Sequence, residues 1–346
     1  MKTKPRIRVR LACVLLALAP GLLPLARAGS AGPGVLLVLN KSGNHLAIVD
    51  PETGRVMARV PTGEQPHEVA VSADGRYAFA ANYGADERPG NSISMIDIAA
   101  RKEARRIDLG GLSKPHGIVE SGGRIYFTAE GSHAIARYDP ASDRVDWIAG
   151  TGQMKTHLLA VTPDGRKIYA SNAGSDTVTA IEQQEGIGIV RIAQIPVGQV
   201  PEGIACSPDG REVWVAHLAD GGISIIDTLT DKVKLRIAAG VTPIRLRFTP
   251  DGRRVLVSNL RTGELTIIDA RSRKAIRHLP VGDAPTNILI NPDGSEAFVS
   301  LAGNNRIAAV DLETCNIKST FDAGAGPDGL AWITGNPRIG TEVLPK

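Results

Sequence analysis

Three histidines occupy matched places in a repeating sequence, and imidazole suits either metal binding or proton transfer. His67, His116 and His157 are 49 and 41 residues apart. Each directly follows a residue, usually proline, that recurs once in every repeat and that we call the landmark residue. Glu202 takes the same place 45 residues further on. Neutral imidazoles and a carboxylate that converge are donors for a zinc, copper or iron ion with one position left open to water or substrate. The same groups also suit acid–base catalysis, because histidine titrates near neutral pH.

A repeat with a period of about 42 residues positions these side chains. Its landmarks are Pro66, Pro115, Thr156, Pro201, Pro243, Pro285 and Pro327. Turns rich in Asp and Gly recur at residues 72–75, 162–165, 207–210, 249–252 and 291–294. Each unit reads as four short β-rich runs bounded by turn residues, which at this period is typical of propeller blades. Seven units therefore predict an all-β, seven-bladed β-propeller with four antiparallel strands per blade.

The two ends of the repeat predict how the ring closes. The first unit supplies three outer strands, at 35–39, 45–50 and 56–61, and the last unit ends with a lone inner strand at 327–332. We expect this C-terminal strand to complete the first blade, because closure leaves no unpaired sheet edge. The third strand of each unit ends in an acidic residue: Asp50, Asp97, Asp139, Glu182, Asp227, Asp269 and Asp311. We expect these acids to cap the following turn.

The best-preserved unit resembles the YVTN family of β-propeller repeats. Its matching segments are KIYASN at 167–172, DTVTAI at 176–181, IPVG at 195–198 and PEGIACSPDG at 201–210. The resemblance extends from Val35 to about Ile333 and implies the propeller fold. Proteins of this architecture include surface-layer and periplasmic binding proteins, lactonases, virginiamycin B lyase and metal- or haem-bearing reductases. The resemblance therefore implies no single activity.

Residues 1–28 have the pattern of a secretory signal peptide. A basic start is followed by the apolar run 11–25 and by Ala26-Arg27-Ala28, which forms an A-x-A cleavage site. We expect cleavage before Gly29, a periplasmic or secreted protein, and no membrane or lipid anchor. The predicted organisation is a signal peptide at 1–28, a single propeller domain at 29–333 and a flexible C-terminal tail at 334–346.

Charge and cysteine content argue against several classes of function. Loss of the leader removes six basic residues and no acid, which lowers the formal charge from +4 to −2, so no nucleic-acid partner is expected. Cys206 and Cys315 fall in different layers of separate blades, so no disulfide is expected. The absence of C-x-x-C-H excludes a covalently attached c-type haem, and G-x-S-x-G, P-loop and H-E-x-x-H motifs are also missing. We expect a monomer.

The repeat also places the other residues of the channel mouth. The position after each landmark reads His67, His116, His157, Glu202, Ile244, Thr286 and Asp328. The end of the second strand reads Asn40, Asn82, Glu130, Asn172, His217, Asn259 and Leu301. Blades two to five carry the His and Glu residues, whereas the inner strands of blades six and seven are expected to be apolar or weakly polar, with Ile244, Arg245, Thr286 and Asn287. This asymmetry predicts one ligand bound off-centre, beside the long loop 83–91, which is a candidate lid.

Structural explanations compete with these assignments. Any one histidine alone is best explained by packing and a hydrogen bond to a carbonyl group. We assign no chemical role to His45 and His133, because loop positions tolerate polar residues freely. For the trio taken together, convergence in one pocket favours a site. Glu202 and Asp328 are candidates for a ligand, a base or a cation holder, or else are solvated carboxylates. His278 alone falls away from this face.

Two functions from different classes follow. The first is an exported binding protein that uses the channel mouth to hold a small ligand, a metal or a protein partner. The second is a metal-dependent enzyme of lactonase, lyase or oxidoreductase type. In that case His67, His116 and His157 hold the metal, and Glu202 or His217 is the fourth ligand or the general base.

Overall fold

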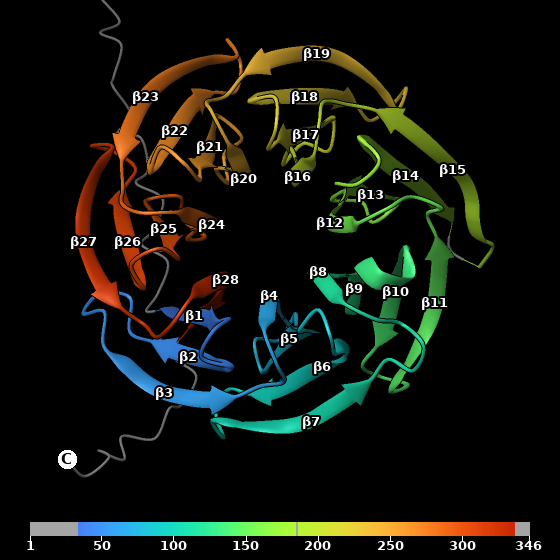
Figure 1. The fold of residues 1–346 in the computed structure, drawn as a ribbon, viewed down its shortest axis with the longest axis horizontal. Helices are drawn as coiled ribbons and strands as arrows, with labels where there is room; N and C mark the ends of the chain where they lie inside the picture. The colour runs from blue at the N-terminus through green and yellow to red at the C-terminus, as the bar shows by residue number, and fades with distance from the viewer. Residues whose placement is uncertain (1–33, 185, 336–346) are drawn as a thin grey trace, which may run out of the picture. The chain divides into compact units, whose positions relative to one another are not determined.

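The computed structural model describes residues 34–184 and 186–335. These residues form seven antiparallel sheets of four strands each, arranged around a central channel (Figure 1). The innermost strand of each blade borders the channel, and the fourth strand lies at the outer rim. The predicted all-β, seven-bladed propeller with four antiparallel strands per blade is confirmed.

The first four blades follow the chain in order. Blade one contains β1 (Gly34–Asn40), β2 (His45–Val49), β3 (Val56–Pro61) and, from the other end of the repeat, β28 (Pro327–Thr334). Blade two contains β4 (Pro66–Val71), β5 (Tyr77–Gly84), β6 (Pro89–Asp97) and β7 (Lys102–Asp108). Blade three contains β8 (Pro115–Ser121), β9 (Arg124–Ala129), the 3-10 helix η1 (Glu130–Ser132), β10 (Ala134–Asp139) and β11 (Arg144–Gly150). Blade four contains β12 (Thr156–Val161), β13 (Lys167–Asn172), β14 (Thr177–Gln184) and β15 (Gly188–Pro196).

The remaining three blades repeat the same order from the channel to the rim. Blade five contains β16 (Pro201–Cys206), β17 (Glu212–His217), β18 (Gly222–Asp227) and β19 (Lys232–Ala238). Blade six contains β20 (Pro243–Phe248), β21 (Arg254–Asn259), β22 (Glu264–Asp269) and β23 (Lys274–Pro280). Blade seven contains β24 (Pro285–Ile290), β25 (Glu296–Leu301), β26 (Arg306–Asp311) and β27 (Asn316–Asp322).

The ring closes in the predicted way, by pairing the two ends of the repeat. β28 lies antiparallel to β1, with partners that run from Gly34–Thr334 to Asn40–Pro327. β28 therefore ends one residue beyond the predicted domain boundary at 333. Closure gives every blade a full set of strands and leaves no inner strand unpaired along its sheet.

The acids at the ends of the third strands cap the following turns in six of the seven blades. Asp50 Oδ1, for example, accepts hydrogen bonds from the N–H groups of Glu52 and Thr53 at 3.0 and 3.3 Å. Equivalent bonds are accepted by Asp97, Asp139, Asp227, Asp269 and Asp311. The prediction is wrong for Glu182, because the third strand of blade four continues to Gln184 and Glu182 instead pairs with Arg191 on β15.

The hydrophobic core lies between the blades. The cluster that joins blades two and three includes Phe79, Ile93 and Phe127, none of which has any exposed surface. Similar clusters join the other neighbouring blades, so each sheet is held from both sides by buried apolar contacts. This packing makes the inner strands a rigid frame for side chains that face the channel.

Local irregularity at the start of each inner strand presents two consecutive residues near the channel. In β4 the register with β5 shifts between Pro66 and Val69, and the same shift follows the landmark residue in blades three to seven. Such a shift leaves the intervening residues outside the regular ladder. Close approach of the next blade explains a glycine here, since a Cβ at Gly117 would lie 2.9 Å from the carbonyl oxygen of His157.

Some predictions concern segments outside the described residues. The predicted signal peptide at 1–28 and the predicted tail from residue 336 onward lie there. Among the described residues, no helix has the length and apolarity needed to cross a membrane. Cys206 and Cys315 are both free thiols.

Candidate functional site

The three ring-position histidines form a row at the channel mouth. They come from the beginnings of β4, β8 and β12, and the ring centroids are 4.4 Å apart for His67 and His116 and 3.9 Å apart for His116 and His157. His67 and His116 are only 8% and 2% exposed. The ring of Tyr83, from β5, packs against the row with its centroid 4.7 Å from that of His67. The three imidazoles, which the repeat places at equivalent positions without showing that they meet, therefore lie in contact in the structure.

Two carboxylates hold the ring of His157. Its Nδ1 lies 3.0 Å from Glu130 Oε2 and its Nε2 lies 2.6 Å from Glu202 Oε2, and the Tyr83 hydroxyl donates to Glu130 Oε1 at 3.1 Å. Burial by itself lowers the pKa of His157, but the charge of Glu202 and the hydrogen bonds to both carboxylates outweigh burial and raise the pKa to about 9. His157 is thus an imidazolium at neutral pH when no other cation is present.

The other two histidines each keep one ring nitrogen without a hydrogen-bond partner among the described residues. These atoms are Nε2 of His67 and Nδ1 of His116, and both are buried. His67 Nδ1 lies 3.3 Å from Asp328 Oδ2. Burial, followed by the nearby charges of His157 and His67, holds the pKa of His116 well below its usual value, so its ring is neutral with a free lone pair. Buried polar atoms without partners are uncommon in folded proteins, and each requires an explanation such as a bound ion or water.

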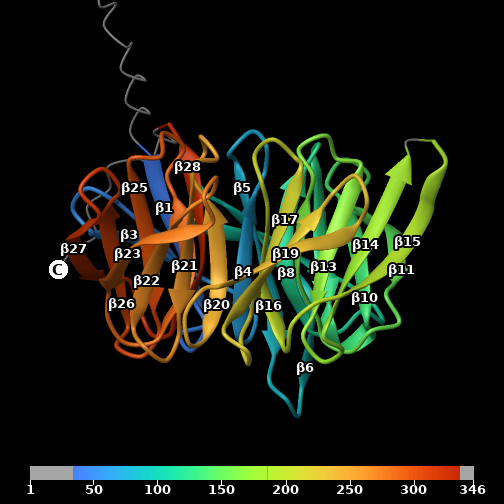
Figure 2. The same cartoon turned by 90° about the horizontal axis from the view of Figure 1, so that it is seen from above.

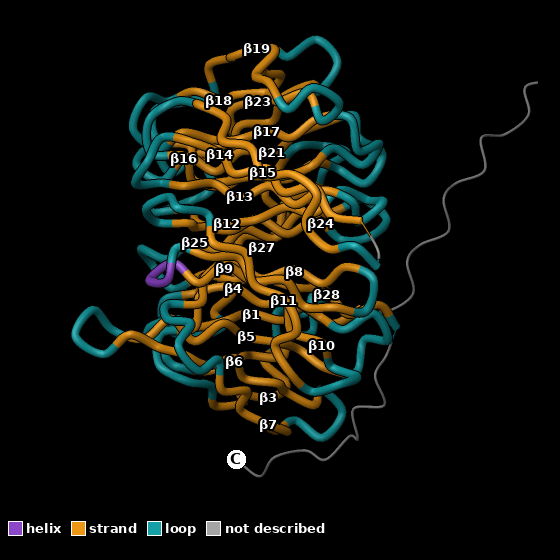
Figure 3. The backbone as a smooth tube through the Cα atoms, turned by 90° about the vertical axis from the view of Figure 1, so that its right-hand side faces the viewer, coloured by secondary structure: helices purple, strands orange, loops and turns teal. Residues whose placement is uncertain are grey.

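A pocket of about 250 Å³ opens above this row. It is off-centre, because its walls come from blades one to five and include Lys41, Lys155 and Gln65 at the rim. The β5–β6 hairpin, which contains the predicted lid, projects from the same face of the ring (Figures 2 and 3). Gly84 and Asp86 of this hairpin line the pocket wall. The hairpin thus stands beside the pocket.

One group of side chains at the pocket could hold a metal ion. His116, Glu130 and His157 each offer a donor atom, and these atoms lie within 4.8 Å of one another. Two imidazole nitrogens and a carboxylate oxygen are ligands of zinc, copper and iron sites. His67 and Glu202, which the sequence also predicted as ligands, stand next to this group: His67 packs on His116 and Glu202 bonds His157 from its far side.

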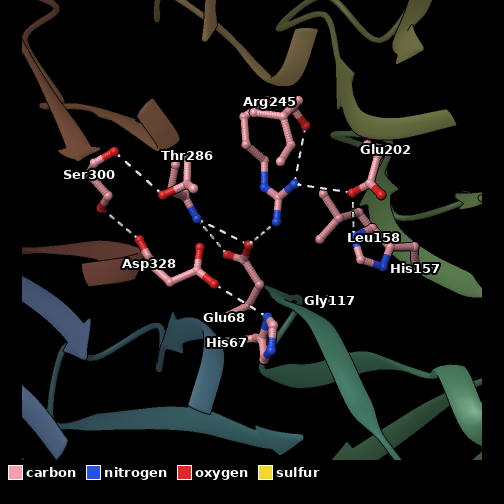
Figure 4. A network of polar contacts seen from close by, with 12 residues as sticks. His67, Glu68, Gly117, His157, Leu158, Glu202, Arg245, Thr286, Ser300 and Asp328 are labelled. Carbon is pink, nitrogen blue, oxygen red and sulfur yellow. Dashed lines mark hydrogen bonds and ion pairs between the residues drawn. The ribbon is translucent and has the colours of Figure 1, made fainter. Parts of the chain in front are cut away.

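A network of charged and polar side chains spans the channel next to the pocket (Figure 4). Arg245 of β20 donates to Glu68 of β4 at 3.1 Å, and Asn287 of β24 donates to both oxygens of the same carboxylate at 3.1 and 2.8 Å. Arg245 also lies 3.6 Å from Glu202 Oε2, which links this bridge to His157. Glu68, Arg245 and Asn287 are at most 5% exposed. We call these three residues the cross-channel bridge.

The cross-channel bridge corrects the expectation that the inner strands of blades six and seven are apolar or weakly polar. Arg245 is a buried cation whose pKa is raised above its usual value, because Glu68, Asp328 and Glu202 outweigh the opposing effect of burial. Sequence reasoning compared all seven blades at the first position after each landmark but not at the second. The second position reads Glu68, Gly117, Leu158, Gly203, Arg245, Asn287 and Gly329, and its single acid and single base on blades across the channel were the missed signal.

The structure does not bring His217 to the pocket. Its Nε2 accepts a hydrogen bond from the N–H of Gly198 at 3.2 Å, and its Nδ1 lies 3.1 Å from Asp220. The alternative role of His217 as fourth ligand or base is therefore not supported by its contacts. Glu130, which the sequence marked as a departure from the repeat without assigning it a role, takes that place beside His157.

The remaining histidines have the expected structural contacts. His45 Nδ1 lies 3.0 Å from the carbonyl oxygen of Gly43, and His133 Nδ1 lies 2.9 Å from that of Gln153. His278 lies on the outer strand β23, with Nδ1 3.2 Å from the hydroxyl of Thr266.

The closed ring and its mouth define a seven-bladed propeller with a polar, histidine-rich channel entrance. The model of the YNCE-like beta-propeller family matches residues 118–291, just over half of the chain, and the chain belongs to this family. The prediction of a propeller-repeat family is confirmed at this level, while the narrower YVTN assignment stays a prediction. Comparison with curated proteins gave no match.

Several solved structures are similar in fold. Hydrazine synthase of Kuenenia stuttgartiensis is 20% identical with a TM-score of 0.71, and the match covers 80% of this chain and 92% of that one. The periplasmic gluconolactonase of Pseudomonas aeruginosa is 17% identical with a TM-score of 0.71 and coverage of 87% and 99%. A Bacteroides fragilis protein with a provisional 6-phosphogluconolactonase assignment is 15% identical with a TM-score of 0.74 and coverage of 88% and 99%. At such low identity these likenesses establish the fold alone.

Proposed function

We propose that this protein is an exported binding protein whose channel mouth holds one first-row transition metal ion and presents it to a small ligand. The observation that carries the proposal is the group of His116, Glu130 and His157, whose donor atoms lie within 4.8 Å of one another at the floor of a pocket. The free Nδ1 of His116 supports it, because a neutral buried imidazole with no partner suits a metal ligand.

The contacts of His157 fit a metal ligand whose ring is held in place by a hydrogen bond from its second ring nitrogen. Metal-bound histidines commonly bond a carboxylate through the second ring nitrogen, which fixes the ring and strengthens its donor atom. Glu202 is in that place on Nε2 and is itself linked to Arg245, while Nδ1 faces Glu130. In this proposal Nδ1 of His157 and the Glu130 carboxylate would hold the metal, His157 would release its Nδ1 proton to solvent, and Glu202 would remain the orienting partner.

A second candidate is a metal-dependent enzyme, and the basic rim of the pocket favours it. Lys41 and Lys155 line the pocket, and no acidic side chain pairs with either among the described residues. They suit an anionic substrate, and a metal ion with an open coordination position supplies Lewis-acid chemistry. The fold likeness to a gluconolactonase makes sugar-acid lactones the first substrates to test.

Elemental analysis of protein purified from the periplasm without a histidine tag tests the metal. We expect near-stoichiometric zinc, copper or iron in the native protein and in His278→Ala, which removes a histidine from the outer strand β23. The variant with both His116→Ala and His157→Ala should contain none. Native protein that is empty and also takes up no added zinc, copper or iron would contradict the proposal.

Lactone hydrolysis, followed by acid release at constant pH, separates the two candidates. Turnover that disappears on chelation and returns with metal supports the enzyme. A metal-loaded protein that is inactive on these lactones argues for the binding protein.

A further inference from the structure

The channel has a second cavity at its other end. Its volume is about 480 Å³, and its walls are the last residues of the inner strands and the Asp-Gly turns that follow them. This volume lies within the range of roughly 300 to 1,000 Å³ that is typical of small-molecule sites. The candidate metal site, by contrast, is formed by residues at the beginnings of the inner strands. The second cavity is therefore a separate place on the molecule.

One repeat position distinguishes this end of the channel. The fourth residue after each landmark reads Ala70, Val119, Ala160, Ala205, Arg247, Leu289 and Ala331. Six blades thus supply small or apolar side chains, and blade six alone supplies a cation. Five of these residues, Arg247 among them, line the cavity. A charge at a position that is otherwise apolar requires an explanation, because burying a charge without a partner costs free energy.

Arg247 has no hydrogen-bond or ion-pair partner among the described residues. The contrast with Arg245, two residues earlier on β20, is clear, since Arg245 donates to Glu68. Arg247 is partly buried, and burial lowers its pKa, with the charge of Arg245 acting in the same direction and that of Glu68 opposing it. An arginine in such surroundings is stabilised by an anion, and its planar guanidinium matches a carboxylate.

The other walls of the cavity are mostly apolar. Leu159, Ile204, Phe248 and Ile290 contribute large hydrocarbon surfaces. Of the other ionisable groups that line it, Glu120 accepts a hydrogen bond from the N–H of Gly123, and burial raises the pKa of the Cys206 thiol to about 12. Among the described residues, the cavity therefore offers one guanidinium without a side-chain partner between mostly apolar walls, together with one carboxylate, Glu120, that is held by a backbone N–H.

We propose that this cavity binds a small monocarboxylate with an apolar body, with the carboxylate on Arg247 and the hydrocarbon against the inner strands. The proposal is independent of the metal site.

Calorimetric titration with octanoate and with 1-octanol tests the proposal on the chelator-treated full chain. These probes share an apolar body and differ in charge. We expect native protein to bind octanoate and to bind octanol much more weakly. Arg247→Gln should weaken octanoate binding by roughly tenfold to a hundredfold, because it removes charge-assisted hydrogen bonds. Arg253 lies in the turn that follows β20 and pairs with Asp251, so Arg253→Gln should bind octanoate like the native protein.

A second variant tests where the hydrocarbon lies. Ala160→Leu places extra bulk in the cavity wall and should weaken both probes, while an unchanged melting temperature shows that the propeller is folded. Three results would overturn the proposal: no binding of octanoate by native protein at millimolar concentration, equal binding of octanol, or full binding by Arg247→Gln.

Discussion

Blades three and five depart from the repeat at the same position, with opposite consequences. In four blades this position, at or near the end of the second strand, is asparagine, and in blade two the side chain of Asn82 accepts a hydrogen bond from the N–H of Gly63, in the loop that leads to the inner strand. Blade five has His217 at this position and blade three has Glu130. Comparing these two residues distinguishes a side chain that keeps the structural hydrogen bond of Asn82 from one that has a different role.

In blade five the histidine makes the same bond that Asn82 makes in blade two. His217 Nε2 accepts from the N–H of Gly198, which is the counterpart of Gly63, so its Nδ1–H must point to Asp220. The ring is 1% exposed and makes these contacts only within its own loop region, among the described residues. A histidine in an unusual repeat position is therefore no evidence of chemistry by itself.

In blade three a backbone carbonyl takes over the structural bond. The N–H of Leu112, the counterpart of Gly63 in the loop before β8, donates to the carbonyl oxygen of Leu109 at 3.2 Å. Glu130 itself begins η1, the short helix that occurs only in this blade among the described residues. Glu130 is thereby free to bond Tyr83 and His157 at the channel mouth. The substitution gains a new role because the local backbone supplies a substitute for the old one.

Restoring the repeat residue in each blade gives the largest expected difference. Glu130→Asn should lower metal affinity by more than the roughly 10- to 100-fold that loss of an outer partner costs, because it removes a proposed ligand. His217→Asn should leave metal affinity unchanged. Both are measured by competition with a chromophoric chelator.

Equal losses in the two variants would contradict the distinction between the blades. Glu130→Asp, which keeps the charge on a shorter side chain, is the matched control and should retain part of the affinity.

The residues of the cross-channel bridge also differ from the other blades at their repeat position, and we expect them to affect the free energy of unfolding. Glu68→Leu leaves Arg245 buried without its main partner, and we expect a loss of about 3–5 kcal/mol in the free energy of unfolding. The control is Glu64→Ala, which breaks an exposed pair with Arg88 and should cost less than about 1 kcal/mol. Urea unfolding measures both.

The double variant Glu68→Leu with Arg245→Met checks the cause. It should recover most of the lost stability, since it removes the isolated charge. A Glu68→Leu variant as stable as Glu64→Ala would show that the bridge has no net effect.

The fold followed from the sequence because it depends on repeated features. The landmarks, the turns and the unpaired strands at the two ends specify blade number and closure without any long-range information, and β28 pairs with β1 as expected. The failure at Glu182 has a local cause, because β14 and β15 extend into a longer hairpin in blade four. An exception within one blade is not visible in the common pattern.

The site was predictable only in part, because side-chain direction is not a property of the repeat. The row of His67, His116 and His157 followed from their shared position. Whether Glu130 or His217 turns toward the row depends on which backbone N–H groups need an acceptor nearby. Arg245 was missed because its partner Glu68 lies 177 residues away along the chain, on a blade across the channel.

The smallest effect is the pH dependence that His217 contributes to stability. Burial holds its pKa below the usual value of 6.5, with Arg236 acting in the same direction and Asp220 and Asp176 opposing. The unfolded chain therefore binds a proton more readily than the native protein, so stability is complete above about pH 6.5 and declines as the pH falls below it. The decline from this one group is at most about 1.4 kcal/mol per pH unit.

His217→Asn removes this titration while keeping an acceptor for the N–H of Gly198, as asparagine does for Gly63 in blade two. We expect the variant and the native protein to have similar free energies of unfolding at pH 8, and the variant to be the more stable at pH 5. His278→Asn, on the outer strand β23, is the control for loss of a histidine. Its free energy of unfolding should change between pH 8 and pH 5 by the same amount as that of the native protein. Parallel stability curves for native protein and His217→Asn from pH 8 to pH 5 would mean that the blade-five histidine is not held neutral by its structural bond. The contrast with blade three would then need another explanation.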